Sequence, residues 1–258
     1  MGFFDKVKNA FGSKNFKYLD KLIHSGVKEI VLDSDIVLDP DEESQYLNGI
    51  KLDVDDLAID GNGHAIDALG LTRIFYCTGK NIIIKNIILK NGFTKNDGGA
   101  IHNYEGELTI TESTLQQNTA KGYGGAINNW GELTITKSTL TGNTAEGSGG
   151  AICNVGGVLT ITGSTLTGNT AQDGSGGAIN NWGELTITKS TLNNNTAKNS
   201  DGGAIDNNEG ELTITESTFN ENTADNGGAL YLNQKTKKYE SENCTFKDNK
   251  PDDVYEEK

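Results

Sequence analysis

The most constraining feature of this sequence is an internal repeat of about 26 residues. The motif Gly-Gly-Ala followed by Ile or Leu recurs at this spacing, and its copies begin at Gly98, Gly124, Gly149, Gly176, Gly202 and Gly227. Between successive copies lie a Leu-Thr-Ile-Thr segment and then a Leu/Phe-x-x-Asn segment. A period between roughly 20 and 50 residues is typical of supersecondary units that stack on one another. The sequence therefore predicts a solenoid.

The short segments within each repeat alternate apolar and polar residues. In the first Leu-Thr-Ile-Thr copy, Leu108 and Ile110 are predicted to point inward, while the intervening threonines point outward. Alternation with a period of two is typical of half-buried strands. The low proline content, 2 of 258 residues, agrees with this interpretation because proline cannot donate a hydrogen bond to a sheet.

The predicted fold is an all-β, right-handed parallel β-helix with a short N-terminal helical cap. Three strands per repeat form one coil of about 26 residues, and we expect about eight or nine coils, stacked about 4.8 Å apart. The chain divides into an amphipathic helical cap (1–26), irregular coils (27–97), regular coils (98–250) and a polar C-terminal tail (251–258).

A cap is expected because the end of a solenoid exposes apolar edges. The apolar faces of the two predicted cap helices are formed by Phe4, Val7 and Phe11 and then by Tyr18, Leu19, Leu22 and Ile23. The segment is also basic, with Lys6, Lys8, Lys14, Lys17 and Lys21. Contact with an anionic membrane is therefore an alternative, but capping is the preferred role because the first coil has to be covered.

Stacking of identical coils predicts ladders of identical side chains. The asparagine that closes each Leu/Phe-x-x-Asn segment is placed at a turn, where its amide can bond to the next copy; these residues are Asn118, Asn143, Asn169, Asn195, Asn222 and Asn249. The paired glycines are expected to adopt turn conformations that a Cβ would obstruct. On the surface, we expect Lys137 and Lys189 to form a salt-bridged row with Glu112 and Glu216.

Charge and cysteine content exclude several classes of function. The net charge is −14 and Arg73 is the only arginine, which argues against nucleic-acid binding. Cys77, Cys153 and Cys244 lie far apart, so neither a disulfide framework nor a zinc site is predicted. No apolar run reaches a membrane span of about 20 residues, and the N-terminus lacks the apolar core of a signal peptide. Taken alone, these features indicate a cytoplasmic protein.

The repeat motifs also resemble those of known families. Gly-Gly-Ala-Ile together with Leu/Phe-x-x-Asn resembles the repeats of the bacterial polymorphic outer-membrane proteins. The segments LAIDGNGHAID (57–67) and NIIIKNIILKNG (81–92) are similar to those of archaeal adhesin-like β-helix proteins. The resemblance covers about residues 27–250 and implies a pectin-lyase-like fold, an adhesive or structural role and a location at the cell surface. It implies no catalytic residue.

Two sets of outward residues are candidate binding sites. Thr-x-Thr pairs are predicted to form two files on one sheet, with members Thr109, Thr111, Thr134, Thr136, Thr160, Thr162, Thr186, Thr188, Thr213 and Thr215. Their grid is similar to that of ice-binding solenoids, although threonine is also simply a good strand residue. Three aromatic residues at equivalent turn positions, Tyr104, Trp130 and Trp182, can stack on sugars or proteins. Packing over the glycine that follows each aromatic is the commoner role.

Catalysis is disfavoured because the candidate residues follow the repeat instead of breaking it. A pectate-lyase type of enzyme needs an acidic Ca²⁺ site and a basic residue, and the carboxylates Glu107, Glu132, Glu184 and Glu211 form only a repetitive row. We therefore assign no catalytic, cofactor or metal residues. The preferred interpretation is a monomeric, non-catalytic solenoid whose repetitive polar surface binds a protein or glycan, as an adhesin does, or acts as a scaffold. A polysaccharide-acting lyase and an ice-binding protein are the alternatives.

Overall fold

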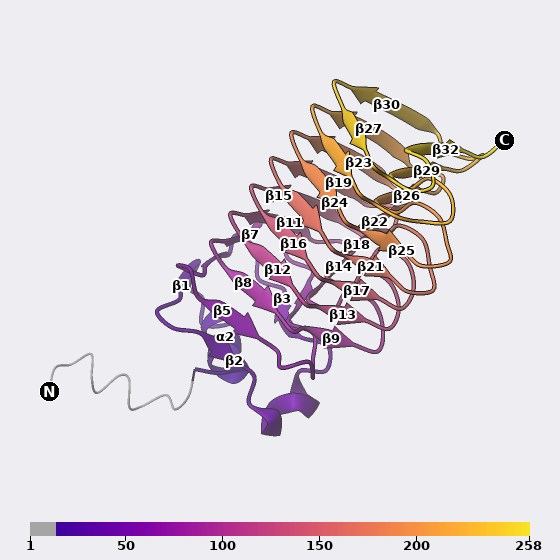
Figure 1. Ribbon diagram of the computed structural model, residues 1–258. Helices are drawn as coiled ribbons and strands as arrows, with labels where there is room; N and C mark the ends of the chain where they lie inside the picture. Colours follow the sequence, from indigo (N-terminus) through magenta and orange to yellow (C-terminus); the bar gives the residue numbers. More distant parts are fainter. Residues whose placement is uncertain (1–13) are drawn as a thin grey trace, which may run out of the picture.

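The computed structural model describes residues 14–258 as one stack of parallel coils (Figure 1). Each coil contributes one strand to each of three main parallel sheets, and each of these three sheets has nine strands. The chain therefore makes about nine turns, and the predicted all-β parallel β-solenoid is confirmed. In Figure 1 the coils follow one another from the indigo N-terminal end to the yellow C-terminal end.

The sheets, named A to C here, run the length of the stack. Sheet A contains β1 (Glu29–Val31), β4 (Ala58–Asp60), β7 (Ile82–Lys85), β11 (Glu107–Thr111), β15 (Glu132–Thr136), β19 (Val158–Thr162), β23 (Glu184–Thr188), β27 (Glu211–Thr215) and β30 (Lys238–Glu242). Sheet B contains β2 (Ile36–Val37), β5 (Ala65–Asp67), β8 (Ile88–Lys90), β12 (Thr114–Gln116), β16 (Thr139–Thr141), β20 (Thr165–Thr167), β24 (Thr191–Asn193), β28 (Thr218–Asn220) and β31 (Thr245–Lys247). Sheet C contains β3 (Ile50–Leu52), β6 (Phe75–Cys77), β10 (Ile101–Asn103), β14 (Ile127–Asn129), β18 (Ile152–Asn154), β22 (Ile179–Asn181), β26 (Ile205–Asn207), β29 (Leu230–Leu232) and β32 (Val254–Glu256).

A fourth, shorter sheet lies between sheets B and C. It is built from the two-residue strands β9 (Phe93–Thr94), β13 (Thr119–Ala120), β17 (Thr144–Ala145), β21 (Thr170–Ala171) and β25 (Thr196–Ala197). This sheet was not predicted from the sequence, because a strand of two residues is too short to show a period.

The core is formed by the inward residues of the three main sheets. In β11 the burial pattern alternates as predicted: Leu108 and Ile110 are buried, and the threonines between them are partly exposed. Strands of adjacent coils pair without a shift, so that Leu108 lies opposite Leu133 and Ile110 opposite Ile135. The apolar side chains therefore stack into continuous columns.

At the corners of the coils, a residue with left-handed backbone conformation lies next to a ladder of buried polar side chains. At the corner that follows sheet B, the Nδ2 atom of each asparagine donates to the Oδ1 atom of the next, for example Asn143 to Asn169 at 3.0 Å and Asn169 to Asn195 at 3.0 Å. This is the predicted asparagine ladder. The residue before the asparagine has a positive φ, as in Gln117 at 55° and Gly142 at 62°.

Two further ladders were not predicted. A second asparagine ladder closes the strands of sheet C and runs through Asn103, Asn129, Asn154, Asn181 and Asn207 at 2.7 to 2.8 Å. A serine ladder turns the chain from sheet A to sheet B, where the backbone N–H of each serine donates to the hydroxyl of the next, as from Ser138 to Ser164 at 3.0 Å. Both ladders satisfy polar groups that would otherwise be buried without partners.

The paired glycines have two different roles. The first of each pair has a positive φ, such as 71° at Gly176, which confirms the expected turn conformation. The second has no room for a side chain, because a Cβ on Gly177 would lie 2.2 Å from the carbonyl oxygen of Gly203 in the next coil. The backbones of adjacent coils can therefore approach this closely only because the second residue of the pair, as at Gly177, is glycine.

The N-terminal end of the solenoid is covered by α2 (Phe16–Ile23), which buries Phe16, Leu19 and Ile23 against the first coils. Asn15 caps this helix by accepting a hydrogen bond from the backbone of Tyr18 at 3.0 Å. The other cap helix expected from the sequence, with Phe4, Val7 and Phe11, lies outside the described residues. A short 3₁₀ helix, η1 (Pro40–Gln45), interrupts the irregular coils.

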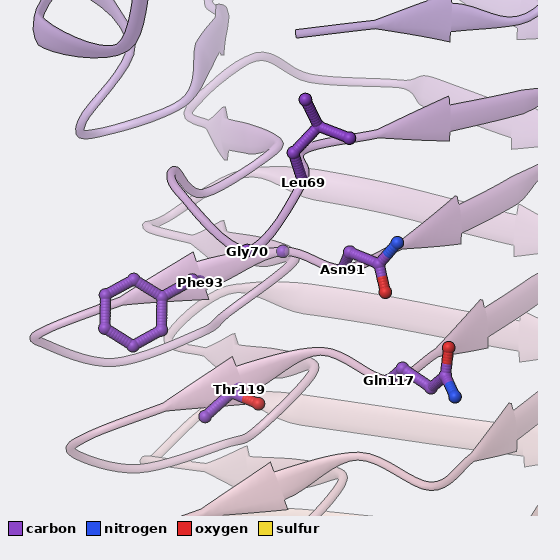
Figure 2. A pocket seen from close by; sticks show the side chains of 7 residues that line it. Leu69, Gly70, Asn91, Phe93, Gln117 and Thr119 are labelled. Atoms are coloured by element: carbon purple, nitrogen blue, oxygen red, sulfur yellow. The ribbon is translucent and has the colours of Figure 1, made fainter. Parts of the chain in front are cut away.

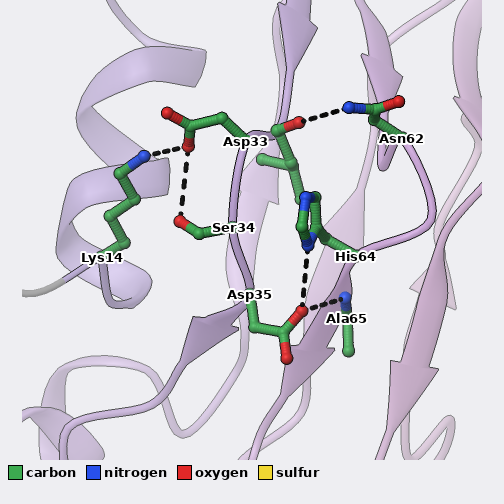
Figure 3. Close-up of polar contacts among 8 residues, drawn as sticks. Lys14, Asp33, Ser34, Asp35, Asn62, His64 and Ala65 are labelled. Atoms are coloured by element: carbon green, nitrogen blue, oxygen red, sulfur yellow. Dashed lines mark hydrogen bonds and ion pairs between the residues drawn. The ribbon is translucent and has the colours of Figure 1, made fainter.

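Polar contacts tie the first coils to the chain around them (Figure 3). Lys14 is ion-paired with Asp33, whose carboxylate also accepts from the hydroxyl of Ser34. Asp35 accepts from the backbone N–H of Ala65 at 3.0 Å and lies 3.3 Å from Nδ1 of His64. The backbone hydrogen bond from Ala65 is the main reason that the pKa of Asp35 lies below its usual value.

The C-terminal coil is more polar than those before it. In β30 only Tyr239 is partly buried, so the alternation of the regular coils is lost. Residues 251–258, which we expected to be a tail, include β32, and this strand pairs with β29. The cysteines Cys77, Cys153 and Cys244 are all free.

Candidate binding face

The threonine files lie on the outer face of sheet A. In the five Leu-Thr-Ile-Thr strands, each threonine pairs with its counterpart in the next coil, as Thr109 does with Thr134 and Thr111 with Thr136. The rows are straight, and most of their members are partly exposed. At the end of these strands, Lys137 lies 3.8 Å from Glu112 and Lys189 lies 3.7 Å from Glu216. This is the predicted salt-bridged row.

Exposed aromatic side chains gather around sheet C instead. Tyr104, Trp130 and Trp182 are 43% to 48% exposed at the turn that leaves this sheet. Tyr123, 51% exposed, precedes the glycine pair that enters the sheet, and Tyr255 belongs to its last strand. Within residues 14–258 these five are the only aromatic side chains classed as exposed. Exposed aromatics are the residues most suited to contact a ligand, so sheet C is the stronger candidate for a binding face.

The central residue of each strand in sheet C points away from the core, and this outward file varies from coil to coil. Its members are Lys51, Tyr76, His102, Asn128, Cys153, Asn180, Asp206, Tyr231 and Tyr255. Every other strand position of the regular coils keeps the repeat more closely. This file was not predicted from the sequence, although the variable residue in Ile-x-Asn was the signal that could have revealed it.

The middle of the file is buried even though it points outward. Asn128, Cys153, Asn180 and Asp206 are each at most 2% exposed. Three polar atoms in the file have no hydrogen-bond partner among the described residues: Nδ1 of His102, Oδ1 of Asn128 and Oδ1 of Asp206. Unpartnered polar atoms in a buried position are costly and call for an explanation.

The two tryptophans on this face are held differently. The indole Nε1 of Trp182 donates to Oδ1 of Asn180 at 2.6 Å. The other end of the Asn180 amide donates from Nδ2 to Oδ2 of Asp206 at 2.9 Å. Trp130, in the equivalent place two coils earlier, makes no such bond within residues 14–258, and its neighbour Asn128 is unpartnered at Oδ1.

Burial controls the charge of the titratable groups in the file. Burial is the main reason that the pKa of the Asp206 carboxyl is raised to about 7; the nearby charge of Asp201 acts in the same direction, and a hydrogen bond from Asn208 opposes the shift. Burial likewise lowers the pKa of His102 and raises that of the Cys153 thiol to about 12. The floor of this face is therefore mainly uncharged below neutral pH, and Cys153 is a poor nucleophile.

At the N-terminal end of the face, three aromatic rings stack. The ring centroids of Tyr76 and His102 are 5.3 Å apart and nearly parallel, and Tyr104 lies 6.2 Å from His102. Arg73 lies over Tyr76 but is buried, and it donates to the backbone carbonyls of Gly98 and Asp97. Burial lowers the pKa of Arg73 to about 10. Its contacts show a structural role at the first glycine pair.

A separate hollow of about 440 Å³ lies where the irregular coils meet the regular ones (Figure 2). Its lining combines Leu69 and Phe93 with the amides of Asn91 and Gln117 and with Thr119. Phe93 occupies the position that threonine takes in the next coils, and it also borders a second hollow of about 300 Å³. Phe93 of the fourth sheet borders both hollows, and none of the five exposed aromatic residues lines either of them.

No group of three or more His, Cys, Asp or Glu side chains within residues 14–258 is arranged to hold a metal ion. In the same range, none of the helices has the length and apolar character needed to traverse a bilayer.

Comparison with known proteins supports the likeness inferred from the repeat motifs. The family model for the Chlamydia polymorphic membrane protein repeat matches residues 137–155 and 216–233. The chain thus carries repeats of the polymorphic membrane protein type. Each matched segment runs from the corner after sheet A, through the asparagine ladder and the glycine pair, into sheet C. No curated protein and no solved structure matches the chain.

Proposed function

We propose that this chain is a non-catalytic, adhesin-like solenoid that binds an extended protein or glycan partner along the face of sheet C. The observation that carries the proposal is the concentration of exposed aromatic residues beside one sheet, while the other faces carry repetitive threonine and charged residues. Parallel strands place equivalent residues about 4.8 Å apart, so the face offers a row of contacts and not a single pocket. The polymorphic membrane protein repeats are consistent with a surface-associated role.

The proposal is tested by comparing two surface variants of the full chain. The first replaces Tyr104, Trp130 and Trp182 by serine, and the matched control replaces three threonines of sheet A, Thr134, Thr160 and Thr186, by serine. All six side chains are at least partly exposed, so both variants should fold, which circular dichroism checks.

Wild type and both variants are then applied to a glycan array and to pull-downs from cell-surface extracts. Binding that is lost only in the aromatic variant supports the proposal. If the wild type retains no ligand in either assay, the binding role fails and a purely structural scaffold replaces it.

The register of the threonine files favours a second candidate, ice binding. Their spacing is about 4.8 Å across the coils and about 6.6 to 7 Å along each strand, and the pairing keeps the rows aligned over five strands. Thermal hysteresis that disappears in Thr136→Tyr would establish this activity. Absence of thermal hysteresis in the wild type excludes it.

A further inference from the structure

Two segments with the same sequence adopt different side-chain contacts on the face of sheet C. Residues 124–140 and 176–192 share seventeen identical residues, which include Asn128 and Trp130 in the first segment and Asn180 and Trp182 in the second. Both tryptophans make the same backbone hydrogen bond: the N–H of Trp130 donates to the carbonyl of Asn103, and that of Trp182 to the carbonyl of Asn154, each at 2.8 Å. The difference in their side chains therefore comes from the neighbouring coils.

The outward residue of the next coil explains the difference. Asn180 is followed in the file by Asp206, whose carboxylate accepts from Nδ2 and so turns Oδ1 of Asn180 toward Trp182. Asn128 is followed by Cys153, and a thiol is a weak acceptor. Among residues 14–258, no side chain fixes the orientation of the Asn128 amide, so its Oδ1 has no donor and the Trp130 indole has no acceptor.

We infer that Trp130 and Asn128 form an open subsite for a neutral glycan, which lies along the solenoid axis on the face of sheet C. This inference rests on the proposed binding function and names its ligand class. A sugar hydroxyl both donates and accepts, so it can satisfy Oδ1 of Asn128 and Nε1 of Trp130 together. The half-exposed indole ring offers an apolar surface to the sugar ring.

Neighbouring residues extend the subsite. Nδ1 of His102 is the unpartnered atom of the preceding coil, and His102 pairs directly with Asn128. Tyr104 stacks on His102 and adds a second exposed ring. Trp182 lies two coils beyond Trp130, about 10 Å away at the coil spacing. This distance is comparable to a disaccharide unit, so a glycan chain can contact both tryptophans.

The side chain of Trp130 is free to adjust to a ligand. Trp130 is 48% exposed, and its indole N–H makes no hydrogen bond within residues 14–258 that a ligand would have to break. A rotation of the Trp182 side chain would break its bond to Asn180. A neutral ligand is favoured over a polyuronate because the chain carries a net charge of −14, Asp206 belongs to the file, and Asp97 and Asp201 lie beside it.

The experiment uses the fact that the chain has only two tryptophans. Trp182→Phe leaves Trp130 as the sole tryptophan, and Trp130→Phe leaves Trp182. Each full-length variant and the wild type are titrated with cellohexaose, xylohexaose, mannohexaose and chitohexaose, with hexagalacturonate as the acidic comparison. Tryptophan emission and calorimetry report binding.

We expect at least one neutral hexasaccharide to change the emission of Trp130 in Trp182→Phe, with an affinity within about twofold of the wild type. In Trp130→Phe the affinity should fall about tenfold, because the indole N–H and part of the stacking surface are lost. Cys153→Asn supplies an acceptor for the Asn128 amide while Trp130 stays in place. This variant should weaken binding about threefold or more, because the indole N–H of Trp130 can then donate a hydrogen bond to Oδ1 of Asn128, and neither group remains open to the ligand.

Equal losses in the two phenylalanine variants, or unchanged affinity in Trp130→Phe, would overturn the assignment of the subsite. Failure of all neutral hexasaccharides to bind would overturn the glycan inference. The proposed function is judged separately: if pull-downs still recover a protein that the aromatic variant loses, the adhesin-like role stands and the ligand is a protein.

Discussion

Replacing Asp206 by asparagine should stabilise the protein at neutral and alkaline pH. Asp206 is 2% exposed, and asparagine already occupies the equivalent position at Asn128 and Asn180. Asn180 and Asn208 both donate to its Oδ2 atom, while Oδ1 has no partner among the described residues. An asparagine oxygen can accept from Asn180 without placing a charge in this buried site, so the solenoid should accommodate the change.

The magnitude follows from the pKa of Asp206. Burial raises this pKa from 3.8 to about 7, so the folded state binds the proton more tightly than the unfolded state. The associated stability is therefore fully present below about pH 4, is lost progressively as the pH rises to about 7, and stays lost above it. A shift of about three units corresponds to a loss of about 4 kcal/mol.

Urea unfolding at intervals from pH 4 to pH 9, followed by tryptophan emission, measures this effect. The free energy of unfolding of Asp206→Asn minus that of the wild type should rise by up to about 4 kcal/mol between pH 4 and pH 7 and then level off. Asp201→Asn is the matched control, because it removes the neighbouring charge that helps to raise the pKa of Asp206. Between pH 4 and pH 7 this variant should lose less stability than the wild type, but it should still lose some, because Asp206 remains buried. A difference between variant and wild type that is flat across this pH range would refute the reasoning.

Four further substitutions test the ladders, the glycine pairs and the surface row by urea unfolding. Asn169→Ala should cost about 3 kcal/mol or more, because it removes a buried amide that donates to Asn195 and accepts from Asn143; a cost below 1 kcal/mol would contradict a stabilising ladder. Gly177→Ala should lower the free energy of unfolding by about 3 kcal/mol, since its Cβ would lie 2.2 Å from a backbone oxygen. Gly168→Ala is the control: Gly168 has a φ of 63° but open space around it, so this change should cost only about 1 kcal/mol. Lys137→Ala should change stability by less than about 0.5 kcal/mol, because its ion pair is exposed.

The fold was predictable because its physical causes recur at every coil. The Leu-Thr-Ile-Thr copies place apolar residues on one side of each strand, and identical units can bury them only by stacking. The asparagine of Leu/Phe-x-x-Asn was recognised as a ladder for the same reason. The serine ladder and the second asparagine ladder were equally repetitive, as in Ser138 and Asn129, but these residues were not separated from the threonines and turns beside them.

The binding face was only partly predictable. Tyr104, Trp130 and Trp182 were recognised from their equivalent turn positions, but the sequence did not show that exposed aromatic residues concentrate beside one sheet. The outward file of sheet C was missed because a repeat analysis favours positions that stay constant. Trp182 and Asn208, in the turns that follow these strands, donate hydrogen bonds to Asn180 and Asp206 of the file, and no strand pattern records such contacts.

The contrast between Trp130 and Trp182 could not have been found from local sequence at all, because the two segments are identical. What separates them is the outward residue of the neighbouring coils: the next coil supplies Cys153 in one case and Asp206 in the other, and the preceding coil supplies His102 or Cys153. In a stacked solenoid, the state of a side chain is thus determined across the sheet as much as along the chain.

This dependence predicts that the two states can be exchanged. Combining Cys153→Asp with Asp206→Cys places the carboxylate after Asn128 and the thiol after Asn180, so the bonded indole should move from Trp182 to Trp130. The two indole N–H signals in a ¹⁵N–¹H NMR spectrum measure the change, because the hydrogen-bonded indole exchanges more slowly with solvent. After assignment with the single phenylalanine variants, slow exchange should belong to Trp182 in the wild type and to Trp130 in the exchanged protein. Slow exchange that stays with Trp182 would show that the next coil does not control the contact.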